Sequence, residues 1–169
     1  MKISHLKGRV ARGFTLIELM VAIALLGILL ALAIPSFSDI IRRMRIESAA
    51  SSLSVAFATA RSEAVKRGRN ISVCKSNNGT ACASSGDWST GWVIYATAGV
   101  PIKVFDAPDG GVSMAGDANM INVVTFTPTG ATTLTAAGSI QVCKTGQTAK
   151  VVSVAVSGRI RVASGGVCS

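Results

Sequence analysis

The feature that most constrains this chain of 169 residues is an apolar run near its N-terminus. Residues 19–34 carry no charged side chain, and Pro35 follows directly after them. As a helix, residues 14–34 would extend about 31 Å at about 1.5 Å per residue, which matches a bilayer core of roughly 30 Å. Because only one run has this length, the sequence disfavours a polytopic membrane protein. It predicts one helix that can anchor the chain in a membrane or pack inside an assembly.

The basic charge of the chain is concentrated in part before this run. The chain has 17 Lys and Arg against 8 Asp and Glu, a formal net charge of +9. Residues 1–13 contribute Lys2, Lys7, Arg9 and Arg12 and no acid. A basic leader before an apolar run is typical of an export signal and favours a membrane orientation with the leader in the cytoplasm. The remaining excess of basic charge favours a phosphate-bearing partner or an anionic membrane surface.

The junction between leader and apolar run, Gly13 to Glu18 (GFTLIE), resembles the cleavage and methylation motif of type IV prepilins and type II secretion pseudopilins. The resemblance implies that prepilin peptidase cuts after Gly13 and that the new amino group of Phe14 is methylated. It also implies that Glu18 pairs with the N-terminus of a neighbouring pilin during assembly. A carboxylate inside an apolar helix is costly unless it is paired, which agrees with that role.

Two plainer readings of this region stay open at this point. Glu18 could lie among solvated headgroups, or residues 14–35 could be a permanent single-pass anchor. Removal of residues 1–13 as a leader would leave 13 basic and 8 acidic side chains, a net of +5. The resemblance further implies an inner-membrane precursor with its C-terminal domain in the periplasm, which then joins a pilus filament at the cell surface.

Beyond Pro35, residues 36–69 show the spacing of one amphipathic helix that continues the first, with a bend expected at the proline. Gly68 predicts the end of this helix, because glycine is common just after the last turn. The apolar face consists of Ile46, Ala49, Ala50, Leu53, Ala56, Phe57, Ala60 and Ala64. Residues 14–35 and 36–69 are therefore the two halves of one long N-terminal helix.

Residues 70–169 alternate β-like runs with Gly, Asn, Asp and Pro turns, and they predict an antiparallel β-sheet domain. The expected strands are residues 70–74, 91–95, 102–105, 121–127, 139–143, 150–156 and 159–163. The dipeptide Ser157-Gly158 predicts a hairpin between the last two. A helix followed by strands indicates an α+β fold, and the resemblance implies the type IV pilin-like arrangement of a long helix packed on the sheet.

The four cysteines of residues 70–169 allow three disulfide pairings. Proximity favours Cys74–Cys82, and Cys143–Cys168 would then tie the last strands to the sheet. Export favours disulfides. A zinc site is the rival reading, but close Cys-x-x-Cys ligands are missing and the only histidine of the chain is His5. We expect no metal, no cofactor and no enzymatic activity. Asp106 and Asp109 flank Pro108, where acids most often serve turns.

Two further motifs narrow the resemblance within the superfamily. The segments ARSEAV at residues 60–65 and FTPTG at residues 126–130 resemble the minor pilins and pseudopilins that include FimT, FimU and GspH. Together with the N-terminal motif, this resemblance covers most of the chain. Arg61 and Glu63 stand two residues apart, which is too close in sequence for pairing across a helical turn, and we interpret both as structural.

The sequence Gly158-Arg159-Ile160-Arg161 resembles the Gly-Arg-x-Arg motif of FimT-type minor pilins, which is linked to DNA capture in natural transformation. In an extended strand, Arg159 and Arg161 share one face about 6.6 Å apart, close to the spacing of DNA phosphates. Gly158 is expected to lift both arginines clear of the sheet.

Residues 118–169 carry four basic side chains and no acid. Lys144 and Lys150 are expected to extend the arginine pair, and Lys66, Arg67, Arg69 and Lys75 form a weaker cluster. Binding would be mainly to the phosphate backbone and independent of base sequence. Two hypotheses remain: a DNA-binding minor pilin for DNA uptake, and a FimU- or GspH-like structural subunit that primes or caps a type IV pilus or type II secretion pseudopilus without binding DNA.

Overall fold

The computed structural model describes residues 13–96 and 100–169, and for residues 31–36 it describes the backbone alone. The basic leader side chains at residues 2–12 and His5 lie outside the described residues. The chain divides into two compact units, Met1–Ser38 and Asp39–Ser169. The hydrophobic core and both disulfides lie within the second unit. That unit therefore has the apolar core and cross-links with which to fold on its own.

Helix α1 (Leu16–Arg67) is a single element of 52 residues. Its assignment continues through Pro35, and the bend expected there stays a prediction. Its predicted end is confirmed, because Gly68 adopts φ 61 directly after the last helical residue. The Arg69 N–H then donates to the Ala64 carbonyl at 3.3 Å, which satisfies one of the open carbonyls of the last turn.

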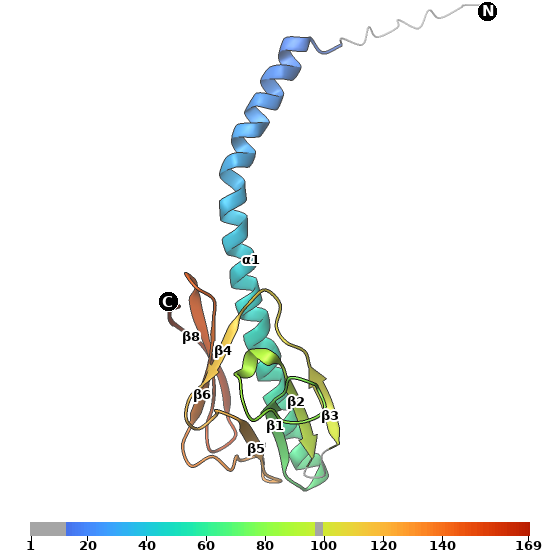
Figure 1. The fold of residues 1–169 in the computed structure, drawn as a ribbon, viewed down its shortest axis with the longest axis vertical. Helices are drawn as coiled ribbons and strands as arrows, with labels where there is room; N and C mark the ends of the chain where they lie inside the picture. The colour runs from blue at the N-terminus through green and yellow to red at the C-terminus, as the bar shows by residue number, and fades with distance from the viewer. Residues whose placement is uncertain (1–12, 97–99) are drawn as a thin grey trace, which may run out of the picture. The chain divides into compact units, whose positions relative to one another are not determined.

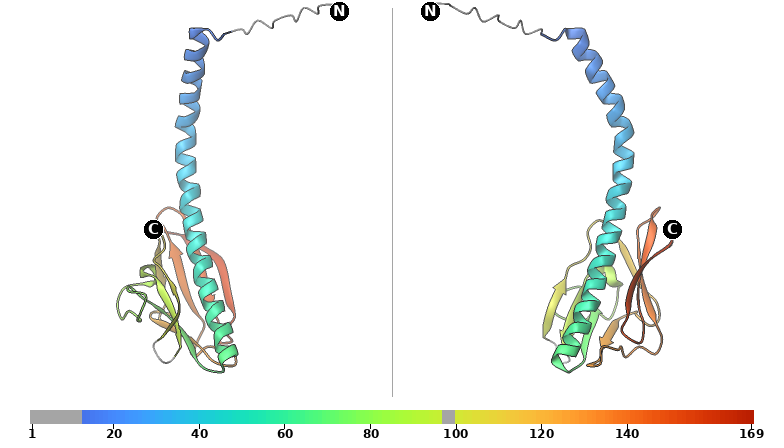
Figure 2. Two further views of the ribbon diagram at one scale, coloured as in Figure 1. Left: turned by 90° about the vertical axis from the view of Figure 1, so that its right-hand side faces the viewer. Right: turned by 180° about the vertical axis from the view of Figure 1, so that it is seen from behind.

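Two four-stranded antiparallel sheets pack on the second half of α1. One has the order β3-β2-β1-β5 and the other β4-β6-β7-β8. Figures 1 and 2 show β1, β2 and β3 on one side of this half of the helix and β4, β6 and β8 on the other. The strands are β1 (Ile71–Lys75), β2 (Trp92–Ala96), β3 (Pro101–Phe105), β4 (Ser113–Gly116), β5 (Val123–Phe126), β6 (Gly138–Cys143), β7 (Thr148–Val154) and β8 (Ile160–Val167).

The α+β fold class is confirmed, and all seven expected strands are present with ends shifted by at most four residues. Strand β4 and the 3-10 helix η1 (Trp88–Thr90) were not predicted. Strand β4 has the sequence Ser-Met-Ala-Gly, and only its Met114 is buried. Four residues with a single buried apolar side chain give too short a pattern for a strand prediction.

The core lies between the helix and the two sheets. All eight residues of the predicted amphipathic face are buried. The Phe57 ring lies 6.0 Å from Trp88 and 6.3 Å from Phe126, measured between ring centroids. Because Trp88 belongs to η1 and Phe126 to β5, Phe57 joins segments that are far apart in the sequence. Aromatic rings at these separations stabilise a core beyond the area that they bury.

Both predicted disulfides are confirmed. Cys74–Cys82 closes the loop after β1, with 5.5 Å between the Cα atoms. Cys143–Cys168 joins the end of β6 to the C-terminus, with 5.7 Å between the Cα atoms. No cysteine of the chain is free, so the zinc reading of these residues is excluded. Each cross-link closes a loop, which stabilises the fold mainly by restricting the unfolded chain.

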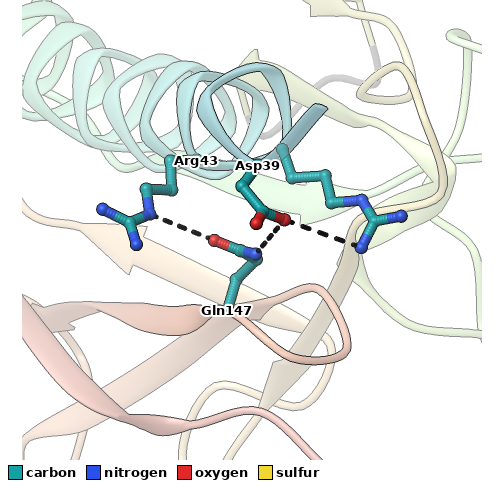
Figure 3. Close-up of polar contacts among 4 residues, drawn as sticks. Asp39, Arg43 and Gln147 are labelled. Atoms are coloured by element: carbon teal, nitrogen blue, oxygen red, sulfur yellow. Dashed lines mark hydrogen bonds and ion pairs between the residues drawn. The ribbon is translucent and has the colours of Figure 1, made fainter. Parts of the chain in front are cut away.

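A set of polar contacts connects α1 to the turn between β6 and β7 (Figure 3). The Gln147 side-chain amide donates to Asp39 Oδ1 at 3.2 Å, and its carbonyl oxygen accepts from Arg43 Nε at 3.2 Å. Arg42 Nη1 lies 3.9 Å from the same Asp39 oxygen. Gln147 is 6% exposed, so its two amide bonds satisfy a largely buried polar group. We call these four residues the helix–turn contact.

One helical turn further along, Glu47 of α1 binds Lys150 of β7. The Lys150 ammonium lies 2.8 Å from Glu47 Oε1. The hydrogen bond from Lys150, together with its positive charge, holds the pKa of Glu47 below the usual value of 4.5. Because the folded pKa is lowered, this pair stabilises the fold above the pKa of an unfolded glutamate. That stabilisation is lost as the pH falls through the folded pKa.

Replacement of Glu47 by Gln tests this contact. We expect Glu47→Gln to lower the melting temperature of the unit Asp39–Ser169 slightly at pH 7, because an exposed ion pair contributes little to stability. The difference from the wild type should shrink as the pH falls below 4.5, where the glutamate of the wild type also becomes neutral. Thermal melts of both proteins between pH 3 and 7 measure this difference in melting temperature. A difference that stays constant over this range would contradict the role of the charge.

The hairpin between β7 and β8 rests on a buried glycine. The Ala155 N–H donates to the Arg159 carbonyl at 2.9 Å, so residues 156–158 form a three-residue loop. Gly158 is buried at its last position with φ 76. A Cβ on Gly158 would overlap the Gly130 carbonyl oxygen and lie 3.1 Å from Arg61 Nε. Arg61 itself donates to that carbonyl at 2.8 Å. The predicted hairpin is confirmed, and Gly158 packs inward against α1 and residue 130.

We expect Gly158→Ala to destabilise the unit Asp39–Ser169 by about 2 kcal/mol or more. Alanine is disfavoured in the left-handed backbone conformation of this position, and its Cβ would clash with its neighbours. Gly166→Ala is the matched control: a Cβ there meets nothing within 4 Å and the backbone needs no positive φ. Urea unfolding of both variants gives the comparison. Equal stability of the two variants would show that the hairpin tolerates a side chain at position 158.

Candidate functional site

The expected processing site precedes the helix in exposed chain. Gly13 and Phe14 lie outside regular secondary structure, and the Phe14 side chain is 82% exposed. The Thr15 hydroxyl accepts from the Glu18 N–H at 3.3 Å, which caps the first turn of α1. Thr15 and Glu18 also have the spacing of a capping box, a signal that the sequence analysis missed. The bond expected to be cleaved is therefore accessible directly before a capped helix start.

Glu18 lies in an exposed apolar groove on the first unit. The groove has a volume of about 460 Å³, and its lining includes Phe14, Ile17, Val21 and Leu25. Among the described residues, no cation pairs with the Glu18 carboxylate. A carboxylate on an apolar surface becomes costly when that surface is covered, unless the covering partner supplies a positive charge. The arrangement is suited to a second subunit that brings a cation.

The described part of the chain contains no helix that is long and apolar enough to cross a membrane. The membrane segment expected at residues 14–35 stays a prediction.

The two arginines of the C-terminal motif lie on one face of the second sheet. Arg161 pairs with Ser153 in the register of β7 and β8, and Arg159 precedes β8 opposite Ala155. Positions two apart share a face, so both arginines lie on the face turned away from α1. Both are exposed, and neither guanidinium forms a hydrogen bond or ion pair with another described residue. We call Arg159 and Arg161 the arginine pair.

The structure does not bring the two predicted lysines to this face. Lys150 shares the helix-facing side of β7 with the buried Val152 and is bound to Glu47. Lys144 donates from its ammonium to the Gly110 carbonyl of the loop before β4. Both charges stabilise contacts within the domain. The expectation that they extend the arginine pair is therefore corrected, because strand alternation and local partners direct them elsewhere.

The weaker basic cluster is also divided. Lys66 and Arg67 bind Glu63 at 3.8 and 2.6 Å. Lys75 is 2% exposed and donates to the Gly86 carbonyl at 2.7 Å. Arg69, the remaining member, is exposed and its side chain contacts no other charge of the described chain. The arginine pair is the predicted anion site of the described chain in which every charge stays without a partner.

Comparison with known protein families agrees with the geometry. Residues 49–159 match the family of type II transport protein GspH. Residues 8–34 match the prokaryotic N-terminal methylation motif, which contains the predicted cleavage site.

Similar proteins are fimbrial subunits. A fimbrial protein of Pseudomonas aeruginosa is 45% identical over 36% of this chain and 38% of its own length. The type IV major fimbrial protein FimA of Dichelobacter nodosus is 35% identical over 48% of this chain and 43% of its own. The chain thus spans less than half the length of these relatives.

Among solved structures, the type IV minor pilin FimU of Pseudomonas aeruginosa aligns with a TM-score of 0.60 and 26% identity. The alignment covers 72% of this chain and 90% of the FimU chain. The aligned fold, the GspH match over most of the second unit and the methylation motif before it lead to one assignment: this chain belongs to the GspH family of pilin-like proteins.

Proposed function

We propose that this chain is a minor, non-enzymatic subunit of a type IV pilus or a type II secretion pseudopilus. This proposal rests on the Glu18 groove. There the Glu18 carboxylate lies between exposed apolar side chains and has no partner among the described residues. Prepilin peptidase would remove the leader, and the freed amino group on Phe14 of one subunit would neutralise Glu18 of the next. The apolar surface would be buried by neighbouring pilins, which supplies the main driving force for assembly.

Replacement of Glu18 tests this role in the full-length chain. We expect Glu18→Ala to reduce the amount of the protein in sheared filaments at least ten-fold, because an incoming amine would be buried without a counter-charge. The precursor should still be made and cleaved. Glu63→Ala, which removes an acid from the unit Asp39–Ser169, is the control and should enter filaments normally. Immunoblots of sheared and cell fractions provide the measurement, and normal incorporation of Glu18→Ala would refute the assembly role.

DNA binding is a second candidate function, and it rests on the arginine pair. Guanidinium groups bind phosphate through paired hydrogen bonds, and these two have no competing partner among the described residues. They lie about two strand positions apart, roughly 6.6 Å along the backbone. The resemblance of residues 158–161 to the Gly-Arg-x-Arg motif of FimT-type pilins involves the same two arginines. With two arginines to contact phosphates, binding would be weak, independent of base sequence and lost as salt increases.

An electrophoretic shift of duplex DNA by the fragment Asp39–Ser169 tests this candidate. We expect the double variant Arg159→Ala with Arg161→Ala to abolish the shift and to keep its melting temperature. Lys66→Ala with Arg67→Ala removes the same charge from a site already bound to Glu63, and it should keep the shift. Wild-type binding should fall with salt with a slope of about 2, one for each phosphate contact.

If the wild-type fragment fails to shift DNA at low salt, the structural role alone remains. If both double variants weaken binding equally, net charge rather than the arginine pair would be responsible. The assembly experiment on Glu18 is independent of either result, because it concerns the other unit of the chain.

A further inference from the structure

A cleft of about 520 Å³ lies between α1 and the loop that follows β3. Its volume is in the range of small-molecule sites, which is about 300–1,000 Å³. The cleft belongs entirely to the unit Asp39–Ser169 and contains neither the Glu18 groove nor the arginine pair. Its polar side chains come from the helix, from β2 and from the loop: Arg45, Ser48, Ser52, Trp92, Asp106 and Asp109.

Trp92 of β2 gives the first indication of a ligand. It is 1% exposed, and its ring is stacked on Phe105 with 5.7 Å between centroids. Among the described residues, its indole N–H is the buried side-chain donor that has no hydrogen-bond partner. The other tryptophan, Trp88, donates to the Met120 carbonyl at 2.8 Å. A buried donor without an acceptor costs about 1–3 kcal/mol, so an external acceptor at Trp92 would be favourable.

The remaining polar walls are also without internal partners. In the described chain, the side chains of Arg45, Asp106 and Asp109 form no hydrogen bond or ion pair. The same holds for the hydroxyls of Ser48 and Ser52. Asp109 lies in a turn, as expected, and Asp106 lies in the irregular backbone after β3. One cleft thus gathers free donors, free acceptors and hydroxyls.

The cleft is supported by contacts on its outer side. Lys144 donates to the Gly110 carbonyl, which holds the loop from the direction of β6. Gly110 adopts φ 79, and a Cβ there would overlap the guanidinium of Arg45. The missing side chain therefore lets Arg45 lie against the loop. The role of Lys144 is to hold this wall in place, and the position of Arg45 depends on glycine at 110.

The chemistry of the walls excludes several ligand classes. Two carboxylates balance the Arg45 guanidinium and the Lys144 ammonium at Gly110, so the cleft has no excess of positive charge to attract phosphate or other anions. The groups of His, Cys, Asp and Glu in the described chain form no metal-binding cluster. A cationic ligand would satisfy the aspartates but would leave Arg45 and Trp92 without acceptors. A hydroxyl both donates and accepts, so a neutral ligand with several hydroxyls can satisfy every wall.

We propose that this cleft binds a saccharide. Its hydroxyls would accept from Trp92 and Arg45, donate to Asp106 and Asp109, and exchange hydrogen bonds with the serines. This role goes beyond filament assembly and does not depend on it, because the cleft lies apart from the Glu18 groove.

The two indole N–H signals in a nitrogen–proton NMR spectrum give a direct test, since the chain has only two tryptophans. The fragment Asp39–Ser169 is titrated separately with cellobiose, maltose, lactose and N,N′-diacetylchitobiose. We expect at least one of these disaccharides to shift the Trp92 signal saturably while the Trp88 signal stays unchanged. The acetylated peptide Gly-Lys-Gly is the comparison ligand for a polypeptide partner.

Two variants connect the response to the cleft. Asp109→Asn keeps the size of an exposed wall residue and should weaken binding about ten-fold, because a hydrogen bond to a charge is lost. Glu63→Gln makes the same change in charge outside the cleft and should bind like the wild type. Trp92→Phe removes the indole N–H together with part of the ring system, and calorimetry should show similarly weakened binding if its fold is kept.

Three results would overturn the proposal. In the first, none of the four disaccharides shifts the Trp92 signal. In the second, only the peptide shifts it, which would assign the cleft to a polypeptide. In the third, Asp109→Asn and Glu63→Gln bind the disaccharide equally well.

Discussion

The fold of the second unit depends on the burial of one helix face from two sides. The strands of the two sheets form separate hydrogen-bonded sets, so the helix is the element on which both pack. Five of the eight buried positions that were predicted for this face are the small residues Ala49, Ala50, Ala56, Ala60 and Ala64. Small side chains let both sheets approach closely, and Phe57 fills the space between Trp88 and Phe126. The helix therefore determines where the outer face of each sheet lies.

At the edges of this core, charged side chains serve the architecture. Lys150 binds Glu47, Lys144 binds the loop at Gly110, and Arg61 binds the Gly130 carbonyl. A net charge of +9 is thus a poor measure of the charge available to a ligand. Charges that are bound to internal partners contribute less to an external anion than charges without a partner, because their field is already compensated. The arginine pair differs from the lysines in this respect.

The sequence predicted the helix, its end and the fold class because these depend on local periodicity and on glycine. It predicted the disulfides because proximity along the chain left one favourable set. It did not predict the faces of Lys144 and Lys150, because these depend on strand register and on partners more than 30 residues away. Gly158 shows the same limit: its positive φ is a local property, but its burial against Gly130 depends on tertiary packing. The cleft at Trp92 could not be found either, since no motif marks a missing hydrogen bond.

The two candidate binding surfaces of the second unit differ in electrostatic character, and this separates their ligands. The arginine pair presents positive charge on the outer face of β8, where the neighbouring side chains are neutral. The cleft presents two carboxylates against one guanidinium. A polyanion attracted to the arginine pair would meet two carboxylates at the cleft, and a neutral saccharide in the cleft would gain nothing from the arginine pair. Since the two surfaces also come from different elements, occupation of one need not exclude occupation of the other.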